Sequence, residues 1–311
     1  MRHVLYSQQF DRSILDALFR RADEFRRRMA VPSEKAALTQ LHRGKTLFSV
    51  FYEPSTRTRM SFGAAAQHLG MSVVATENAR EFSSAIKGES LEDTIRVLCE
   101  YYPDVIALRH YEIGAAERAA RYSTVPIINA GDGAGQHPTQ ALLDLYTIHQ
   151  ALGTIDGLTV TIGGDLANGR TARSLAYLLA KFDANRILFV APDSLRMGND
   201  IKDHLREKGV AFTEESRLED ALSESDVVYW TRVQKERLGP ESVHEELHAQ
   251  FVIGEAQLDR MKPQAVLMHP LPRLEEIPPE IDPDPRAWYF RQAGNGMFIR
   301  MSLLEWIFES D

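Results

Sequence analysis

The sequence predicts an α/β protein of two doubly wound domains, each a mainly parallel sheet flanked by helices. Short apolar segments alternate with segments of helical periodicity from residue 46 onward, and the alternation starts again after Gly153. The chain has 311 residues, 44% of them hydrophobic, which is enough for two cores. We expect a first domain over residues 1–150, a second over 151–290, and a C-terminal helix over 291–311 that packs back on the first domain.

The first half opens with a helix and continues with strand–helix pairs. Apolar side chains recur on one face of residues 10–29, and the interleaved arginines and acids of the other face predict solvent exposure rather than a nucleic-acid patch. Strands are expected at 46–52, 72–76, 104–109 and 125–129, with helices near 57–69, 90–101, 112–122 and 138–152. Residues 77–89 are polar and aperiodic, which predicts a loop long enough to be a lid or to reach a neighbouring chain.

The second half repeats this pattern of apolar runs and helical spacing. Strands are expected at 158–163, 186–191, 226–230 and 265–268, with helices near 169–181, 200–208, 217–223 and 292–309. Neither half contains an internal repeat or a low-complexity segment.

Composition and charge narrow the class of protein. The net charge is −8, which argues against general binding to nucleic acid or to an anionic membrane. Cys99 is the only cysteine, so the chain can form no internal disulfide, and this suits a reducing cytoplasm. With no leader and no apolar run of membrane-spanning length, we expect a cytoplasmic protein. An anionic ligand would then be attracted by a local cluster of Arg and Lys.

The segment Ser55-Thr-Arg-Thr-Arg59 lies between the first expected strand and its helix. At such a corner the free N–H groups and the positive end of the helix dipole favour anions. Arg57 and Arg59 add guanidiniums, which match phosphate oxygens bidentately, and Ser55, Thr56 and Thr58 add hydroxyls. An ordinary capped helix needs only one hydroxyl, so the pattern predicts a phosphate-binding corner.

Two other polar clusters follow strands of the first half. Arg109 and His110 end the strand expected at 104–109, and a glycine-rich turn leads to His137 and Gln140. The carboxyl ends of parallel strands bind ligands, and the glycines allow close approach of the backbone. His137 could instead be a helix cap or a packed ring. With Gln140 one turn later, we expect both to contact a ligand, His137 by donating to a carbonyl oxygen.

The second half carries basic residues after its strands. Arg170 opens a helix, and Arg232, Gln234, Lys235 and Arg237 follow the strand expected at 226–230. The preceding Gly163-Gly164 turn has the wrong spacing for a dinucleotide fingerprint, so a nicotinamide cofactor is not supported. No metal-ligand spacing and no nucleophile elbow occur. Transfer between a phosphorylated donor and an anionic acceptor, by positioning and electrostatics, fits these residues best.

The last motif, His269-Pro-Leu-Pro-Arg273, follows the strand expected at 265–268. Two prolines fix its backbone and remove N–H groups, so the motif presents carbonyl oxygens to a ligand that carries N–H donors. By itself it could equally be a structural turn.

Three of these segments together resemble the aspartate/ornithine carbamoyltransferase family: Phe51-Tyr-Glu-Pro-Ser-Thr-Arg-Thr-Arg59, His137-Pro-Thr-Gln140 and His269-Pro-Leu-Pro-Arg273. The resemblance extends over nearly the whole chain, to Gln292-Ala-Gly-Asn-Gly296. It implies a carbamoyl-phosphate-binding first domain and an aspartate-binding second domain. Neither a cofactor nor a covalent intermediate is implied.

The resemblance also assigns roles to residues. Catalysis would fall to Arg57, Thr58, Lys87, Arg109 and His137. Carbamoyl phosphate would be bound by these five residues together with Ser55, Thr56, Ser83, Gln140 and the carbonyls of Pro270 and Leu271. Aspartate would be bound by Lys87, Arg170, Arg232, Gln234 and Leu271. Glu53 would orient Arg170 or Arg237.

The acceptor follows from the same resemblance. Residues 231–237 are similar to the aspartate branch, and Pro270 stands where the ornithine branch places a cysteine. Ser83 and Lys87 are similar to a loop that enters the site of an adjacent subunit, which implies a homotrimer with shared active sites. Regulatory chains or a pathway enzyme could be further partners. Another amino-acid acceptor, or a catalytically silent regulatory relative, remains the alternative.

Overall fold

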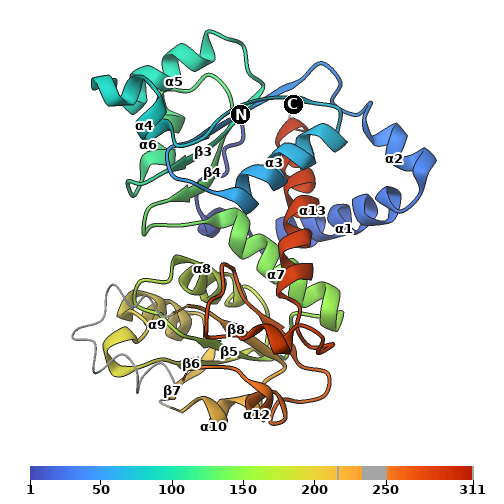
Figure 1. Ribbon diagram of the computed structural model, residues 1–311, viewed down its shortest axis with the longest axis vertical. Helices are drawn as coiled ribbons and strands as arrows, with labels where there is room; N and C mark the ends of the chain where they lie inside the picture. Colours follow the sequence, from blue (N-terminus) through green and yellow to red (C-terminus); the bar gives the residue numbers. More distant parts are fainter. Residues whose placement is uncertain (216, 233–250, 310–311) are drawn as a thin grey trace. The chain divides into compact units, whose positions relative to one another are not determined.

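The chain folds into two compact units in a computed structural model that describes residues 1–215, 217–232 and 251–309 (Figure 1). The first unit comprises Met1–Leu143 and Gly294–Asp311, and the second comprises Asp144–Ala293. The division falls inside helix α7 (Pro138–Leu152), whereas the sequence placed it after that helix. Helix α13 (Tyr289–Phe308) likewise begins in the second unit and continues into the first.

The first unit is built on a four-stranded parallel sheet with the order β2-β1-β3-β4. Helix α3 packs on β1 and β2, while α6 packs on β3 and β4 and also contacts α5. Branched and aromatic side chains such as Phe48, Val50 and Ile106 fill the core beneath α5 and α6. The elements are β1 (Thr46–Phe51), α3 (Thr56–His68), β2 (Ser72–Thr76), α5 (Leu91–Cys99), β3 (Val105–His110), α6 (Ala115–Tyr122) and β4 (Ile127–Asp132).

The second unit has a five-stranded parallel sheet with the order β7-β6-β5-β8-β9. The sequence missed β7, because Phe212 is its only large apolar residue and the strand lies partly exposed at the edge of the sheet. The elements are β5 (Thr159–Gly163), α8 (Arg170–Leu179), β6 (Arg186–Val190), α9 (Asn199–Glu207), β7 (Ala211–Glu215), α10 (Leu218–Leu222), β8 (Val227–Trp230), α12 (Glu255–Leu258) and β9 (Val266–Met268).

The expected loop over 77–89 contains two short helices, α4 (Ala79–Phe82) and the 3₁₀ helix η2 (Ser84–Lys87). Each helix is too short to produce a periodic apolar pattern, and for this reason the sequence indicated only a loop here. Side chains fix the segment: Glu77 pairs with Arg59 at 2.7 Å, and Glu89 accepts hydrogen bonds from Ser84 and Thr94. The segment is thus held by its own chain at both ends.

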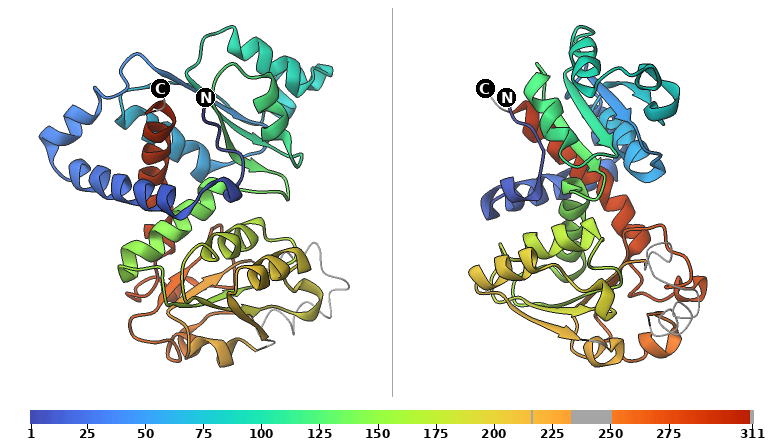
Figure 2. Two further views of the ribbon diagram at one scale, coloured as in Figure 1. Left: turned by 180° about the vertical axis from the view of Figure 1, so that it is seen from behind. Right: turned by 90° about the vertical axis from the view of Figure 1, so that its left-hand side faces the viewer.

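Helix α1 (Arg12–Met29) lies beside the part of α13 that belongs to the first unit (Figure 2). Arg26 of α1 donates to Asn295 and stacks over the Phe298 ring. His42, after the short α2 (Pro32–Leu38), contacts Glu305 at 2.6 Å. Among the described helices, none combines the length and the apolar character needed to cross a membrane.

Gly163 at the end of β5 provides a test of core packing in the second unit. A Cβ atom there would lie 2.0 Å from the Trp230 ring, which is fully buried and donates to the Phe251 carbonyl. We expect Gly163→Ala to lower the free energy of unfolding by about 1–3 kcal/mol through overpacking. Urea denaturation followed by tryptophan fluorescence measures this change.

The matched control is Gly254→Ala in the same unit, where the nearest atom to a new Cβ is at an ordinary 3.5 Å. Because Gly254 is the N-cap of α12, we expect a loss of at most about 1 kcal/mol, from capping rather than packing. Equal stabilities for the two variants would contradict the packing argument.

Candidate active site

The corner predicted to bind phosphate forms where β1 passes into α3. Ser55 is the extended N-cap of α3, and Thr56, Arg57 and Thr58 occupy the first turn, where backbone N–H groups and the dipole favour an anion. Thr58 is buried, while Arg57 and Thr56 are exposed. Since the Ser55 side chain makes no capping bond to the described helix, its hydroxyl is not committed to that role.

The sequence placed Arg59 in this corner, but in the structure its guanidinium points elsewhere. Its guanidinium lies 2.7 Å from Glu77 and so anchors the 77–89 segment. The reason is positional: successive helix residues point about 100° apart, so Arg57 and Arg59 face different directions. The corner therefore has three hydroxyls and one guanidinium.

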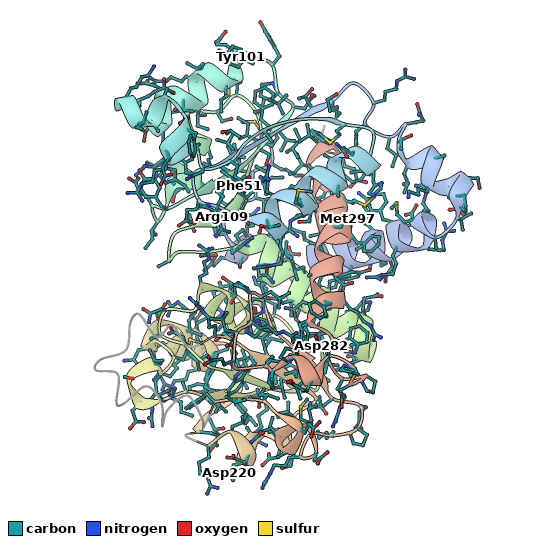
Figure 3. The ribbon with its side chains drawn as sticks, viewed as in Figure 1. Phe51, Tyr101, Arg109, Asp220, Asp282 and Met297 are labelled. Carbon is teal, nitrogen blue, oxygen red and sulfur yellow. The ribbon has the colours of Figure 1, made fainter. Side chains whose placement is uncertain are left out.

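Parallel pairing brings two more predicted residues to this corner. Phe51 at the end of β1 is in register with Arg109 on β3, and both are labelled in Figure 3. His137 follows β4, and its Nε2 lies 3.3 Å from Thr58 Oγ1. The Thr58 hydroxyl and the His137 imidazole thus meet beside the start of α3, and Arg109, paired with Glu53, lies at the same edge of the sheet. They can polarise a carbonyl oxygen and stabilise an oxyanion.

Glu53 is paired with Arg109 within the first unit, and its expected role toward Arg170 or Arg237 stays a prediction. Its carboxylate lies 3.4 Å from Arg109 Nε within the first unit. The expected partners were Arg170, which belongs to the second unit, and Arg237, which lies outside the described residues. In this structure Glu53 therefore stabilises the charge of Arg109.

His110 is a packed ring rather than a ligand. It is buried between Tyr52 and Tyr111, and its Nδ1 accepts the N–H of Glu112 at 3.0 Å. Burial lowers the pKa of His110 and favours the neutral ring. Alternation along β3 explains the difference, since neighbouring side chains point to opposite faces.

The turn between β4 and α7 positions His137 and Gln140. Asp132, which the sequence missed, accepts the N–H of Gln136 at 2.6 Å and that of Gly114 at 2.9 Å. Gly133 has φ +55°, and a Cβ there would lie 2.2 Å from the Tyr111 carbonyl. Only glycine fits this close approach. Gln140 lies in the first turn of α7, and its N–H donates to the His137 carbonyl.

Ser83 and Lys87 lie on the 77–89 segment. Ser83 Oγ donates to the Ala79 carbonyl and accepts the Ala85 N–H. Lys87 is exposed, and within the described part of the chain its ammonium makes no hydrogen bond or ion pair. Among the described residues, no hydrogen bond or ion pair joins Lys87 to the corner at Ser55–Thr58.

The second unit carries the remaining predicted residues. Arg170 begins α8, and Arg232 lies two residues after the end of β8, so both follow parallel strands of the same sheet. Between β5 and α8, Asp165 accepts two hydrogen bonds from Asn168, which closes the turn before Arg170. Gln234, like Lys235 and Arg237, lies outside the described residues.

Hydrogen bonds to buried side chains stabilise the turn at His269–Arg273. The N–H of His269 donates to Gln292 and that of Leu271 donates to His269 Nδ1, at 2.9 and 2.8 Å. His269 Nε2 lies 3.0 Å from Glu276. Leu271 has φ +54°, and the following peptide bond is cis. The turn's own N–H groups are thus satisfied internally, as a structural turn requires, while Pro270 and Leu271 supply the carbonyls that the sequence predicted.

Arg273 completes this turn by pairing with Asp282 and donating to Tyr289. The hydrogen bond from Arg273 lowers the pKa of Asp282, and burial raises the pKa of Tyr289. Arg273 is therefore structural.

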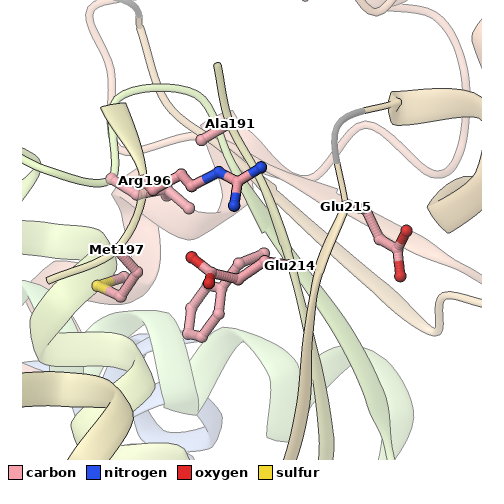
Figure 4. A pocket seen from close by; sticks show the side chains of 7 residues that line it. Ala191, Arg196, Met197, Glu214 and Glu215 are labelled. Atoms are coloured by element: carbon pink, nitrogen blue, oxygen red, sulfur yellow. The ribbon is translucent and has the colours of Figure 1, made fainter. Parts of the chain in front are cut away.

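A pocket in the second unit contains none of the predicted residues (Figure 4). Arg196 and Glu214 line it with apolar neighbours, and Arg196 pairs with Asp193 at 2.7 Å. Among the residues that the structure describes, no group of three His, Cys, Asp or Glu side chains could hold a metal ion.

Two family models match the chain. The carbamoyl-P binding domain of aspartate/ornithine carbamoyltransferases matches residues 2–150, and their Asp/Orn binding domain matches residues 156–307. Chloroplastic aspartate carbamoyltransferase 3 of Pisum sativum is 54% identical over 97% of this chain and 76% of its own length. The multifunctional protein CAD of Squalus acanthias is 46% identical over 97% of this chain and 13% of its own.

Solved structures are similar as well. The catalytic subunit of M. jannaschii aspartate transcarbamoylase has a TM-score of 0.91 and 42% identity, over 99% of this chain and 98% of its own. Aspartate transcarbamoylase from Trypanosoma cruzi, bound to N-(phosphonacetyl)-L-aspartic acid, has a TM-score of 0.89 and 40% identity, over 97% of this chain and 94% of its own.

The carboxyl of Glu276 offers a test of the turn's support. Burial disfavours its charge, but the hydrogen bonds from His269 and from the backbone outweigh burial and hold the pKa below its usual 4.5. Its ionised form therefore stabilises the native state above pH 4.5, and this contribution disappears as the pH falls through the lower folded value. We expect Glu276→Gln to lower the free energy of unfolding by about 1–3 kcal/mol at pH 7.

The difference between Glu276→Gln and the unaltered chain should narrow in urea denaturation as the pH falls below 4.5. Glu280→Gln, at an exposed position of the same unit, is the control and should stay within about 0.5 kcal/mol at pH 7. A gap for Glu276→Gln that is independent of pH would show that the carboxylate charge is not what matters.

Proposed function

This chain belongs to the aspartate/ornithine carbamoyltransferase family, and we propose that it transfers the carbamoyl group of carbamoyl phosphate to L-aspartate. The products are N-carbamoyl-L-aspartate and phosphate, in pyrimidine biosynthesis. The observation that carries the proposal is the convergence of Thr58, Arg109 and His137 beside the anion-binding start of α3. The similar T. cruzi enzyme has been solved with carbamoyl phosphate and aspartate together.

Most of the residues assigned to the donor belong to the first unit, and Pro270 and Leu271 belong to the second. Ser55, Thr56, Arg57 and Thr58 hold the phosphate with backbone N–H groups, hydroxyls and a guanidinium. Thr58, Arg109 and His137 contact the carbamoyl oxygen. Gln140 and the carbonyls of Pro270 and Leu271 accept from the carbamoyl amide, because an amide nitrogen is a donor.

The reaction is one nucleophilic substitution at the carbamoyl carbon. The aspartate amine, in its neutral form, attacks and forms a C–N bond, and the C–O bond to phosphate then breaks. Negative charge develops on the carbamoyl oxygen, where Thr58, Arg109 and His137 stabilise it. The departing phosphate takes a proton from the amine and stays at the corner formed by Ser55–Thr58. Positioning and electrostatics account for the catalysis, without a cofactor.

The acceptor is assigned to residues of the second unit. Arg170 and Arg232, with Gln234 and the Leu271 carbonyl, bind aspartate, and Lys87 contributes an ammonium. Two guanidiniums suit a dicarboxylate and would repel the side-chain ammonium of ornithine. The relatives named above as aspartate enzymes support this choice.

We further propose a cytoplasmic homotrimer whose Lys87 and Ser83 act in the site of a neighbouring subunit. The exposure of Lys87 and its lack of a partner among the described residues support this role. Regulatory chains or a pathway enzyme are candidate partners. CAD and the Dictyostelium discoideum pyr1-3 protein, both named multifunctional, match this chain over 13% of their length.

A direct test measures carbamoyl aspartate colorimetrically with purified chain, carbamoyl phosphate and aspartate. Ornithine replaces aspartate in the control reaction. Turnover with aspartate alone is expected. Turnover only with ornithine would reassign the acceptor, and no turnover by a folded oligomer would favour a silent relative.

The role of Arg232 can be separated from donor binding. Arg232→Ala removes one charged partner of an aspartate carboxylate. We expect kcat/KM for aspartate to fall by a factor that corresponds to about 2–5 kcal/mol of lost transition-state stabilisation. Carbamoyl phosphate affinity, measured by calorimetry, should remain nearly unchanged. Loss of carbamoyl phosphate binding in the folded variant would place Arg232 in the donor site instead.

Sharing of sites predicts complementation between two inactive variants. Lys87→Ala and His137→Ala each remove a catalytic group, so each should be nearly inactive alone. After mild dissociation and random reassembly of closed trimers, about a quarter of the sites should combine an intact Lys87 with an intact His137. Activity regained on mixing, against unmixed controls, measures this. No recovery despite verified subunit exchange would place Lys87 in the site of its own chain.

A further inference from the structure

A buried arginine of the C-terminal helix reaches the back of the site in the first unit. Arg300 of α13 is 2% exposed, and its guanidinium lies over the Phe62 ring with 4.9 Å between Cζ and the ring centroid. Its Nη2 donates to Thr139 Oγ1 at 3.2 Å. A buried guanidinium has a large desolvation cost, so its position beside a hydroxyl needs a physical explanation.

Thr139 continues the contact toward His137. Thr139 is fully buried in the first turn of α7, and its Oγ1 lies 3.4 Å from His137 Nδ1. On the other side of the imidazole, Nε2 lies 3.3 Å from Thr58 Oγ1. The four side chains form one line within the first unit, from the guanidinium through the Thr139 hydroxyl and the imidazole to the Thr58 hydroxyl.

The chemistry of this line favours one position for the imidazole proton. A guanidinium only donates, so the Thr139 oxygen accepts from Arg300 and its own proton points away from the positive charge, toward His137 Nδ1. Nδ1 then accepts, and the single proton of the neutral ring lies on Nε2. The guanidinium charge and the positive end of α7 both oppose a second proton on Nδ1.

We propose that Arg300 is a positioning residue that acts through Thr139 to keep His137 as the neutral Nε2–H tautomer. This inference rests on the proposed function, since Nε2–H is the group that would donate to the carbamoyl oxygen. It explains why α13, remote in sequence, contributes to the site. The wrong tautomer would present a lone pair to the developing oxyanion and repel it.

Gly296 provides the room for this arrangement. It lies one helical turn before Arg300, next to Met297 (Figure 3), and a Cβ there would lie 2.4 Å from Arg300 Nη1. Because that atom is the far end of a flexible side chain, Gly296→Ala should displace the guanidinium rather than the helix. Gly294 in the same helix has nothing within 4 Å of an added Cβ, so Gly294→Ala is the matched control.

The first readout is the tautomer of His137, from ¹⁵N chemical shifts of its ring in long-range ¹H–¹⁵N correlation spectra. The His137→Ala spectrum identifies the signals. The unaltered protein should show the Nε2–H tautomer. Thr139→Val and Gly296→Ala should show a mixture or the Nδ1–H form, while Thr139→Ser and Gly294→Ala should match the unaltered protein. This readout does not depend on turnover.

The second readout is kinetic. Thr139→Val and Gly296→Ala should lower kcat by at least about tenfold with little change in KM for carbamoyl phosphate, because the lost interaction acts in the transition state. Thr139→Ser should retain most of kcat. Two results would overturn the proposed action of Arg300 through Thr139, which we call the relay. One is unchanged tautomer signals and kcat in Thr139→Val, and the other is a loss of kcat in Thr139→Ser equal to that in Thr139→Val. If the unaltered protein is inactive but its His137 tautomer still changes in Thr139→Val, the proposed function is contradicted and the relay is not.

Discussion

Parallel pairing of β1 with β3 and of β3 with β4 is the constraint on which the candidate site depends. Parallel strands end at the same edge of a sheet, so Thr58, Arg109 and His137 converge although they come from three separate segments. Each strand then needs only a short turn to present one polar group. The buried carboxylate of Asp132 fixes the turn that carries His137 by accepting two backbone N–H groups.

A second polar network, in the other unit, supports the His269 turn. Buried Asp144 accepts from Tyr229 and from Gln292, and Gln292 in turn accepts the N–H of His269. Burial, together with the Asp144 charge, raises the pKa of Tyr229, so its phenol remains a donor. A buried polar network stabilises the native state only when each of its polar groups has a hydrogen-bond partner. Asp144, Tyr229 and Gln292 supply acceptors and donors that match one another.

Helices α7 and α13 explain why the first unit is not continuous in sequence, because each is divided between the two units. Residues of α13 from Gly294 onward contact α1 through Arg26 and Asn295, and contact α7 through Arg300 and Thr139. Removing them would expose apolar surface and separate a charge from the hydroxyl beside His137. Folding of the first unit therefore depends on the last residues of the chain, which raises the sequence separation of its contacts.

The sequence by itself determined the α/β class, eight of the nine described strands and the strand-to-helix corner at Ser55–Thr58, because apolar periodicity and strand–helix corners are local features. It could not reveal edge strand β7, the short helices of 77–89, or the partners of Arg59, Glu53 and Arg300. Those depend on which side chains meet after the sheet forms. Charge pairing and burial are properties of three-dimensional neighbours, and only the tertiary structure decided whether His110 or His137 faced the site.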